Sequence, residues 1–249
     1  MSALFEELDY CPTPIGALSL RRRFDLKLKR DVFEIKLGFE SLMTSAFTAS
    51  EIALGRLGLA ALGGASSPDI VVGGLGLGYT AQAVLESAAD ASLIVVEALS
   101  PVIEWHEKGL LPLGTALAET PRCRLICGDF FALAASSEGF DPERPGRTFD
   151  AILVDIDHSP DALLDARSTS FYQPEGLRGV ARHLKSGGVF GLWSDARTDD
   201  AFLARLKSVF TDARAEPVTF LNPLQDRPFT QTVYLARKDG LLPSDEPAP

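Results

Sequence analysis

The segment Asp155-Ile156-Asp157-His158 places two carboxylates and an imidazole close together in the chain. It follows the apolar run FDAILV, which predicts a buried strand, and ligands of open α/β sheets bind at the carboxyl ends of such strands. These side chains could bind an amine, remove its proton, or do both, and neighbouring acids raise one another's pKa, which favours a base. Asp155, Asp157 and His158 are therefore the candidate catalytic residues. The alternative is a polar loop in which Asp157 and His158 are merely solvated.

A glycine-rich loop, Gly73-Gly74-Leu75-Gly76-Leu77-Gly78, follows another apolar run and precedes a predicted helix. Glycines let the backbone turn sharply and approach a ligand closely, and the start of a helix supplies N–H donors. We therefore predict that Gly73, Gly74, Gly76 and Gly78 bind a cofactor. A tight turn with a purely structural role is the alternative.

Two further acids follow predicted strands. Glu97 ends the run SLIVVE, where a carboxylate can accept both ribose hydroxyls of a nucleoside. Asp129 follows CRLICG and could accept from an adenine amino group, while the adjacent Phe130 could cover the ring. The alternatives are a surface acid or helix cap for Glu97 and a helix N-cap for Asp129. An NAD-dependent dehydrogenase fits less well, because it has no need of Asp129 in this place.

The elements that must position these residues alternate in βα style from residue 69 to residue 237. Near-continuous Val/Ile/Leu strands separated by helices predict a parallel sheet covered on both faces. The last two of the seven strands have no helix between them, so one of them must be antiparallel. A helix over residues 171–184 should continue to Lys185-Ser186 and end at Gly187-Gly188.

The N-terminal quarter has a different pattern. Residues 15–38 alternate with period two, which predicts a meander of two or three strands. Residues 44–62 have helical spacing, with Thr48 or Ser50 as the cap. We therefore expect three parts: 1–62, a β-meander and connecting helix; 63–238, the catalytic domain; and 239–249, a disordered tail.

Composition narrows the function classes. The chain has 249 residues, 46 % of them hydrophobic, and a net charge of −10, which is typical of a globular protein. Its acidity argues against nonspecific nucleic-acid binding, and no apolar run approaches the ~20 residues of a membrane span. The N-terminus lacks the pattern of a signal peptide, so we expect a cytoplasmic protein. Three Cys and three His without metal-binding spacing give no support for a metal site.

Together these motifs resemble the spermidine synthase family of aminopropyltransferases, a branch of the class I S-adenosylmethionine (SAM) dependent methyltransferase superfamily. The resemblance covers roughly residues 15–237 and is carried by VVGGLGLG, VVEA, CGDFF, ILVDIDH, SFYQPEGLRGVARHLKSGGVF and TVYLARK. It implies a Rossmann-like α/β fold with a seven-stranded, mostly parallel sheet, an antiparallel last strand and a small N-terminal β extension.

The resemblance also assigns roles to residues. It implies that the glycine loop and Glu97 hold the nucleoside and its ribose, that Gly128-Asp129 contacts the adenine, and that Asp155 is the base for the attacking amine. Phe171-Tyr172 matches the family's aromatic entry into the next helix.

Three departures concern the acceptor side. The family's second acid, three residues after the base, is replaced by His158, and the extra acid here is Asp157. The family's N-terminal Tyr and Gln, which line a polyamine tunnel, have no match in SAFTASEI, and its later Tyr is absent from LNPLQDRPF. The residues that would hold the nucleoside therefore match the family's pattern, and the residues that would hold the polyamine do not.

The expected function is transfer of an aminopropyl or other alkyl group to a small-molecule amine, with SAM or decarboxylated SAM as co-substrate and no metal. The alternatives are a SAM-dependent small-molecule methyltransferase and a non-catalytic nucleoside-binding protein. We expect no nucleic-acid or membrane partner, and assembly as a homodimer remains open.

Overall fold

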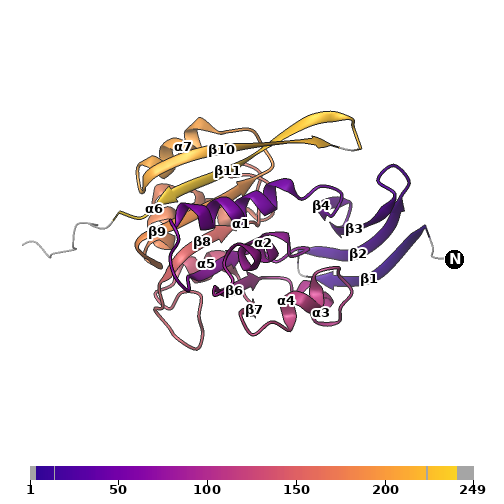
Figure 1. Cartoon of the computed structure of the whole chain (residues 1–249), viewed down its shortest axis with the longest axis horizontal. Coiled ribbons are helices and arrows are strands. Elements are labelled where there is room, and N and C mark those ends of the chain that lie inside the picture. The colour runs from indigo at the N-terminus through magenta and orange to yellow at the C-terminus, as the bar shows by residue number, and fades with distance from the viewer. Residues whose placement is uncertain (1–3, 14, 223, 240–249) are drawn as a thin grey trace, which may run out of the picture.

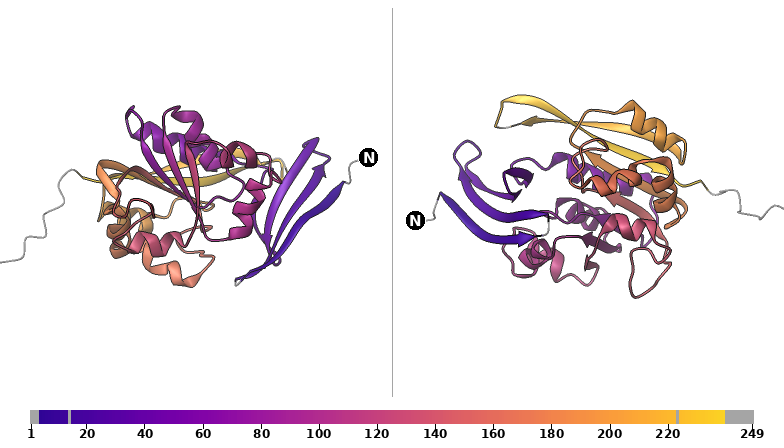
Figure 2. Two further views of the ribbon diagram at one scale, coloured as in Figure 1. Left: turned by 90° about the horizontal axis from the view of Figure 1, so that it is seen from below. Right: turned by 180° about the vertical axis from the view of Figure 1, so that it is seen from behind.

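The computed structural model describes residues 4–13, 15–222 and 224–239. Most of the predicted C-terminal tail, residues 240–249, lies outside the described residues. The chain forms a small antiparallel sheet and a large sheet flanked by helices, and Figures 1 and 2 show the small sheet at one end of the molecule. No helix in the described part of the chain is long and apolar enough to span a membrane.

The small sheet has four strands in the order β1-β2-β3-β4, where the sequence predicted two or three. They are β1 (Phe5–Thr13), β2 (Gly16–Asp25), β3 (Arg30–Leu37) and β4 (Glu40–Thr44). Alternation in β2 and β3 buries Leu18, Leu20 and Ile35 in the core. β1 lacks this alternation and is held by cross-strand ion pairs, such as Arg22 with Glu6 at 2.7 Å.

The large sheet confirms the predicted architecture. Its seven strands have the order β10-β11-β9-β8-β5-β6-β7. Strand β11 pairs antiparallel with both of its neighbours, and the pairings among β5 to β9 are parallel. The strands are β5 (Asp69–Gly73), β6 (Ser92–Glu97), β7 (Cys123–Cys127), β8 (Phe149–Val154), β9 (Leu184–Ser194), β10 (Thr211–Asn222) and β11 (Arg227–Arg237).

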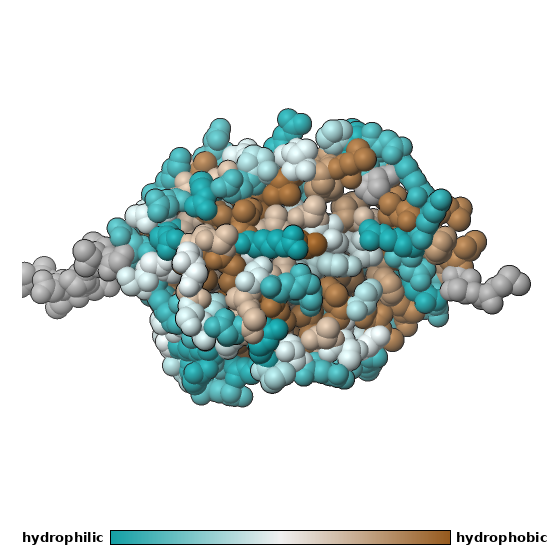
Figure 3. Space-filling model, viewed as in Figure 1, coloured by the Kyte–Doolittle hydropathy of each residue, from teal (hydrophilic) through white to brown (hydrophobic). Residues whose placement is uncertain are grey.

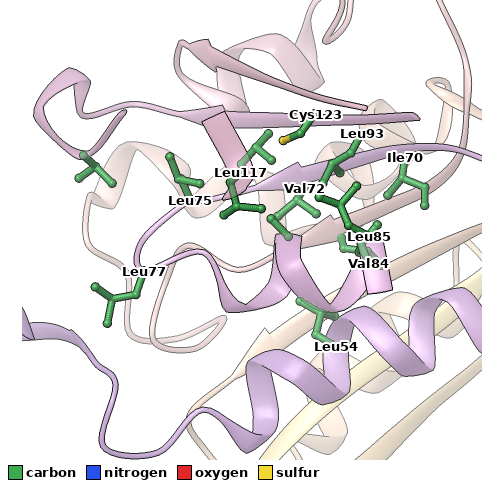
Figure 4. Packing of buried hydrophobic residues seen from close by; sticks show 14 of the residues in the cluster. Leu54, Ile70, Val72, Leu75, Leu77, Val84, Leu85, Leu93, Leu117 and Cys123 are labelled. Atoms are coloured by element: carbon green, nitrogen blue, oxygen red, sulfur yellow. The ribbon is translucent and has the colours of Figure 1, made fainter. Parts of the chain in front are cut away.

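Helices cover both faces of this sheet, so each face has its own hydrophobic core. Figure 4 shows part of the first core, where Val84 and Leu85 lie near Val72 and Leu93. The helices are α1 (Ala49–Ala61), α2 (Tyr79–Ser87), α3 (Ser100–Glu107), α4 (Gly114–Ala118), α5 (Phe130–Ala135), a 3₁₀ helix η1 (Ala166–Tyr172), α6 (Pro174–Ala181) and α7 (Asp200–Lys207).

Helix α1 packs closely on the large sheet and on α2. A Cβ on Gly58 would lie 2.6 Å from a methyl group of Leu153, and one on Gly55 would lie 2.8 Å from the Cβ of Ala83. Helix α1 therefore packs against the large sheet, whereas the predicted boundary at residue 62 groups it with the N-terminal strands. The boundary itself stays a prediction.

Two local expectations are wrong. Helix α6 ends at Ala181, and Gly187-Gly188 lies inside β9, because the backbone becomes extended from Leu184. Thr48 occupies the N-cap position of α1 but makes no side-chain cap hydrogen bond.

Apolar side chains remain exposed at turns around the small sheet. They include Ile15, Leu26, Phe39, Leu221 and Leu224, the last two at the end of the β10–β11 hairpin. In the view of Figure 3, hydrophobic residues gather toward this end of the molecule, and the opposite end is mostly hydrophilic.

A buried ion-pair cluster gives a first prediction, on stability. The fully buried carboxylate of Asp141 contacts Arg124 and Arg147, the latter at 2.8 Å. Burial alone would raise the pKa of Asp141, but hydrogen bonds from both arginines and from the Glu143 backbone lower it to about 2. We expect Asp141→Asn to reduce the free energy of unfolding at pH 7 by about 3 kcal/mol, the low end for breaking a buried pair, because Arg124 is 34 % exposed.

Urea unfolding at several pH values tests this prediction. Because the folded pKa is depressed, the stabilisation is present above the ordinary pKa of 3.8 and is lost as the pH falls toward about 2. The difference in the free energy of unfolding between wild type and Asp141→Asn should therefore become smaller at acidic pH. Glu143→Gln is the matched control, since this side chain contacts the same Arg124 but is 75 % exposed; its change should stay within about 0.5 kcal/mol. Equal losses in both variants would contradict the prediction.

Candidate functional site

A cleft lies at the carboxyl ends of the parallel strands, where the glycine loop and the acids predicted from the sequence converge. The small sheet contributes Ile35, Leu42 and Met43 to it. The remaining lining residues are Glu51, Gly74, Gly76, Val96, Glu97, Ala98, Leu99, Val102, Asp129, Phe130, Phe131, Asp155, Ile156, His158, Leu164 and Trp193. Another hollow, lined by Ala61 and Arg237 among others, lies at the opposite end of the strands and contains none of the predicted site residues.

Gly74 and Gly76 line the cleft, and their conformations require glycine. Gly74 has φ 93°, and a Cβ there would lie 2.0 Å from the backbone oxygen of Asp155. Gly76 has φ 47°, and a Cβ there would lie 2.5 Å from the sulfur of Met43. The sequence predicted that the backbone of the glycine loop would approach a ligand closely. In the structure, Gly74 and Gly76 closely approach the end of β8 and β4 of the same protein.

The loop's N–H groups also donate within the protein. The N–H of Gly74 donates to the Val96 oxygen at 2.9 Å, and that of Gly78 to the Leu75 oxygen at 2.8 Å. The N–H of Leu75 donates to Glu97, and that of Leu77 to the sulfur of Met43. No residue of α2 belongs to the described lining of the cleft. These four N–H groups therefore donate within the protein, and donation from the start of the helix to a ligand stays a prediction.

Gly73 and Gly78 have packing roles. A Cβ on Gly73 would lie 2.6 Å from the ring of Phe130, and one on Gly78 would lie 2.5 Å from Leu117. Neither glycine lines the cleft. Direct contact of Gly73 and Gly78 with a ligand stays a prediction.

His106 supports the glycine loop and was not predicted. It is fully buried in α3, and its Nε2 lies 2.9 Å from the oxygen of Gly76. Burial lowers the pKa of the His106 imidazole, and Nε2 donates to the Gly76 oxygen, because a carbonyl oxygen can only accept. The sequence offers no signal for this role, because the contact joins residues from separate βα units.

Glu97 sits at the end of β6 with its carboxylate inside the cleft. One oxygen accepts from the Leu75 N–H at 3.0 Å and the other from the Leu99 N–H at 2.9 Å. Burial raises the pKa of the Glu97 carboxyl, and these backbone hydrogen bonds oppose the rise. The acid thus holds the glycine loop in place, and it also lines the cleft; its contact with a ribose stays a prediction.

Asp129 caps α5, and it also lines the cleft. Its Oδ1 accepts from the N–H groups of Phe131 and Ala132 at 2.9 and 3.2 Å. Phe130 is only 2 % exposed and stacks on Phe140, with ring centroids 4.9 Å apart. The half-buried Phe131 also lines the cleft, so two aromatic side chains adjoin Asp129. Contact of Asp129 and Phe130 with adenine stays a prediction.

Asp155 follows β8 and is the central acid of the cleft. Its Oδ2 accepts from the Thr80 hydroxyl at 2.6 Å. Burial raises the pKa of Asp155 to about 6, against the lowering effect of that hydrogen bond. A carboxyl with a pKa this close to neutrality is suited to accept a proton in a reaction.

Glu51 is a second acid in the same part of the cleft, and sequence analysis missed it. It is 8 % exposed, in the first turn of α1, and its carboxylate accepts from the Ser50 hydroxyl at 2.6 Å. Burial raises the pKa of Glu51 to about 7, and the charge of Asp155 adds to the rise. An acid three residues after Thr48 is typical of a capping box, so the sequence signal favours a structural role.

Asp157 is placed differently from the prediction. Its carboxylate is buried and accepts from the Leu164 N–H and the Tyr172 hydroxyl, both at 2.7 Å, and from Ser168 at 3.3 Å. It does not line the cleft. The chain turns after β8, and the Asp157 carboxylate is engaged with Leu164, Ser168 and Tyr172, so Asp157 organises the loop before η1.

His158 lines the cleft between two acids. Its Nε2 lies 3.1 Å from a carboxylate oxygen of Glu40, and its Nδ1 lies 3.8 Å from one of Asp195. The His158 side chain is 25 % exposed, so it has both solvent access and contact with the cleft. Its role in orienting an amine or sharing a proton stays a prediction.

The ionisable side chains in the described lining of the cleft are mostly acidic. Four carboxylates belong to its described lining, those of Glu51, Glu97, Asp129 and Asp155, and that lining contains no Lys or Arg. In the ranges that the structure describes, no three His, Cys, Asp or Glu side chains are grouped so that they could hold a metal ion. Such a surface favours cationic or neutral ligands and disfavours a carboxylate.

No protein-family model matches the sequence. Among solved structures, the spermidine synthase from Thermotoga maritima is similar to this chain, with 18 % identity and a TM-score of 0.70; the match covers 93 % of this chain and 72 % of that one. A spermidine synthase in complex with the transition-state analogue AdoDATO gives 17 % identity, a TM-score of 0.69 and the same coverage. Human methyltransferase-like protein 13 in complex with SAH gives 20 % identity and a TM-score of 0.54, covering 81 % of this chain and 83 % of that one.

The chain therefore has the Rossmann-like fold of class I SAM-dependent methyltransferases. Its fold is the spermidine-synthase-like form, because a match over 93 % of the chain is too extensive to leave out the small sheet. At 17–18 % identity the likeness establishes the fold alone.

Proposed function

We propose that this protein transfers an aminopropyl group from decarboxylated SAM to a small-molecule amine. The observation that carries this proposal is the charge of the cleft: four carboxylates line it together with no Lys or Arg among the described lining residues. Decarboxylated SAM has a sulfonium and an ammonium but no carboxylate, and the acceptor amine is also cationic at neutral pH. Both substrates therefore complement the cleft.

Within this proposal each residue has a defined task. Glu97 accepts from the ribose hydroxyls, and Asp129 with Phe131 adjoins the base. The acceptor nitrogen attacks the carbon next to the sulfonium, which is a displacement that mainly requires alignment and removal of a proton. Asp155 takes that proton, because it lies at the end of β8 within the cleft and burial raises its pKa to about 6.

Methyl transfer from intact SAM is the second candidate, since a solved structure with this fold, human methyltransferase-like protein 13, is in complex with SAH. The carboxylate of intact SAM would need a cation or free N–H groups. The described lining offers no Lys or Arg, and the N–H groups of Gly74, Leu75, Leu77 and Gly78 already donate within the protein. This favours the decarboxylated donor.

Calorimetry with the two donors tests the proposal. We expect decarboxylated SAM to bind at least tenfold more tightly than SAM, which corresponds to about 1.4 kcal/mol, a modest value for one charge near buried carboxylates. Methylthioadenosine, which lacks the charged tail, is the control for the nucleoside half and should bind in either case. Equal affinities, or preference for intact SAM, would contradict aminopropyl transfer and support methyl transfer.

A further inference from the structure

The thioether of Met43 reaches from the small sheet onto the glycine loop. Met43 lies in β4, and both Met43 and Gly76 line the cleft. The N–H of Leu77 donates to the Met43 sulfur at 2.9 Å. The missing side chain of Gly76 makes room for this contact, because a Cβ there would lie 2.5 Å from the sulfur. Met43 thus fills the space beside Gly76 and covers the Leu77 N–H from the side of the cleft.

This contact is the weakest of the hydrogen bonds that the loop makes with its N–H groups. The N–H groups of Gly74 and Gly78 donate to backbone oxygens, and that of Leu75 donates to a carboxylate. A thioether sulfur is only a weak acceptor. Among these four groups, the N–H of Leu77 therefore has the most to gain from a better acceptor. Its present acceptor is a side chain of the other sheet, and a substitution can remove it without altering the loop.

A ligand carboxylate is the group that would compete with Met43 for this position. Leu77 lies two residues before the start of α2 at Tyr79, and N–H groups at the start of a helix favour an anion. The described lining of the cleft contains no Lys or Arg that could hold a carboxylate instead. The loop before α2 is therefore the part of the cleft that suits a carboxylate, and an uncharged thioether occupies it.

We propose that Met43 is a specificity-determining residue that keeps a donor carboxylate away from the glycine loop and so selects decarboxylated SAM over SAM. This inference rests on the proposed function. The carboxylate of SAM would lose water in the cleft and meet the thioether in place of an N–H donor, which is unfavourable for a charged group. Decarboxylated SAM has no such group, so the thioether costs it nothing. Met43 acts on binding alone and takes no part in bond formation.

Calorimetry with SAM, decarboxylated SAM and methylthioadenosine tests this role in wild type and Met43→Ala. In Met43→Ala we expect SAM to bind roughly tenfold more tightly than in wild type, because the freed Leu77 N–H can donate to its carboxylate. The affinities of the other two ligands should stay within a few-fold. Met43→Val, which also lacks the sulfur and suits a strand, should give the same result if Ala loosens β4. Leu42→Ala is the matched control, since this neighbour in β4 also lines the cleft; it should leave the ratio of the SAM and decarboxylated SAM affinities unchanged.

The NMR signal of the Leu77 amide gives a second measurement that a purely structural role of Met43 would not change. In Met43→Ala, SAM should move the amide proton downfield of its position with methylthioadenosine, because a carboxylate accepts more strongly than a thioether. In wild type the two ligands should give the same position.

A wild-type ratio of the SAM and decarboxylated SAM affinities in folded Met43→Ala and Met43→Val would overturn the role of Met43. Equal weakening of all three ligands would overturn it as well, because that result indicates packing alone. Both measurements concern binding, so they test Met43 even if no amine accepts a group. Absence of transfer from either donor to any amine would count against the proposed function instead.

Discussion

Replacing Asp155 with Asn should lower turnover by roughly 10²–10⁴ while leaving donor affinity within a few-fold. This range is the usual contribution of a positioned general base. An ammonium cannot attack the donor until it loses a proton, and Asn cannot take one. The nucleoside contacts should persist, because Glu97 and Asp129 follow other strands than β8.

Single-turnover kinetics and calorimetry on the same protein separate these two effects. Asp161→Asn is the matched control: it makes the same chemical change in the segment after β8, at a side chain that is 77 % exposed and outside the cleft. It should keep wild-type rates. Full activity of Asp155→Asn would remove the base mechanism and leave the methyltransferase or nucleoside-binding interpretation.

The large sheet could be predicted because its strands are buried on both faces and thus appear as continuous apolar runs, such as DIVV and AILV. The strand ends could be predicted for the same reason, and with them the positions of Asp155 and Glu97. In contrast, β1 was missed because its residues are mostly exposed and it is held by ion pairs to Arg21 and Arg22, which a local hydrophobic pattern does not reveal.

The candidate site was only partly predictable, because side-chain direction depends on tertiary structure. Asp155 and Asp157 are two residues apart, yet the chain turns after β8 and buries Asp157 against Tyr172 and Ser168. Glu51 comes from the start of α1, far along the chain from Asp155, and reaches the cleft only because α1 packs beside α2. The sequence pattern identified acidic residues that could take part in chemistry. The tertiary structure determines which of these residues lie close together in the cleft.

Glu97 illustrates how one acid can serve both the fold and the ligand. Its two oxygens accept from backbone N–H groups on opposite sides, Leu75 in the glycine loop and Leu99 before α3. A carboxylate oxygen has a second lone pair, so each can also accept from a ribose hydroxyl. In the proposed function, this fixed orientation of the carboxylate would lower the entropic cost of binding a nucleoside.

Replacing Glu97 with Ala should therefore weaken methylthioadenosine binding by roughly 10²-fold or more, since two hydrogen bonds to a charged group contribute about 1.5–3 kcal/mol each. Glu97→Gln keeps the shape but loses one acceptor, so it should fall between Ala and wild type. Because burial raises the pKa of Glu97, wild-type affinity should decline on acidification at a higher pH than an ordinary Glu would give, and both variants should lose that dependence. Calorimetry across pH measures all three proteins, with Glu107→Ala on the exposed side of α3 as the control. Wild-type affinity in a folded Glu97→Ala protein would show that the nucleoside does not rest on this acid.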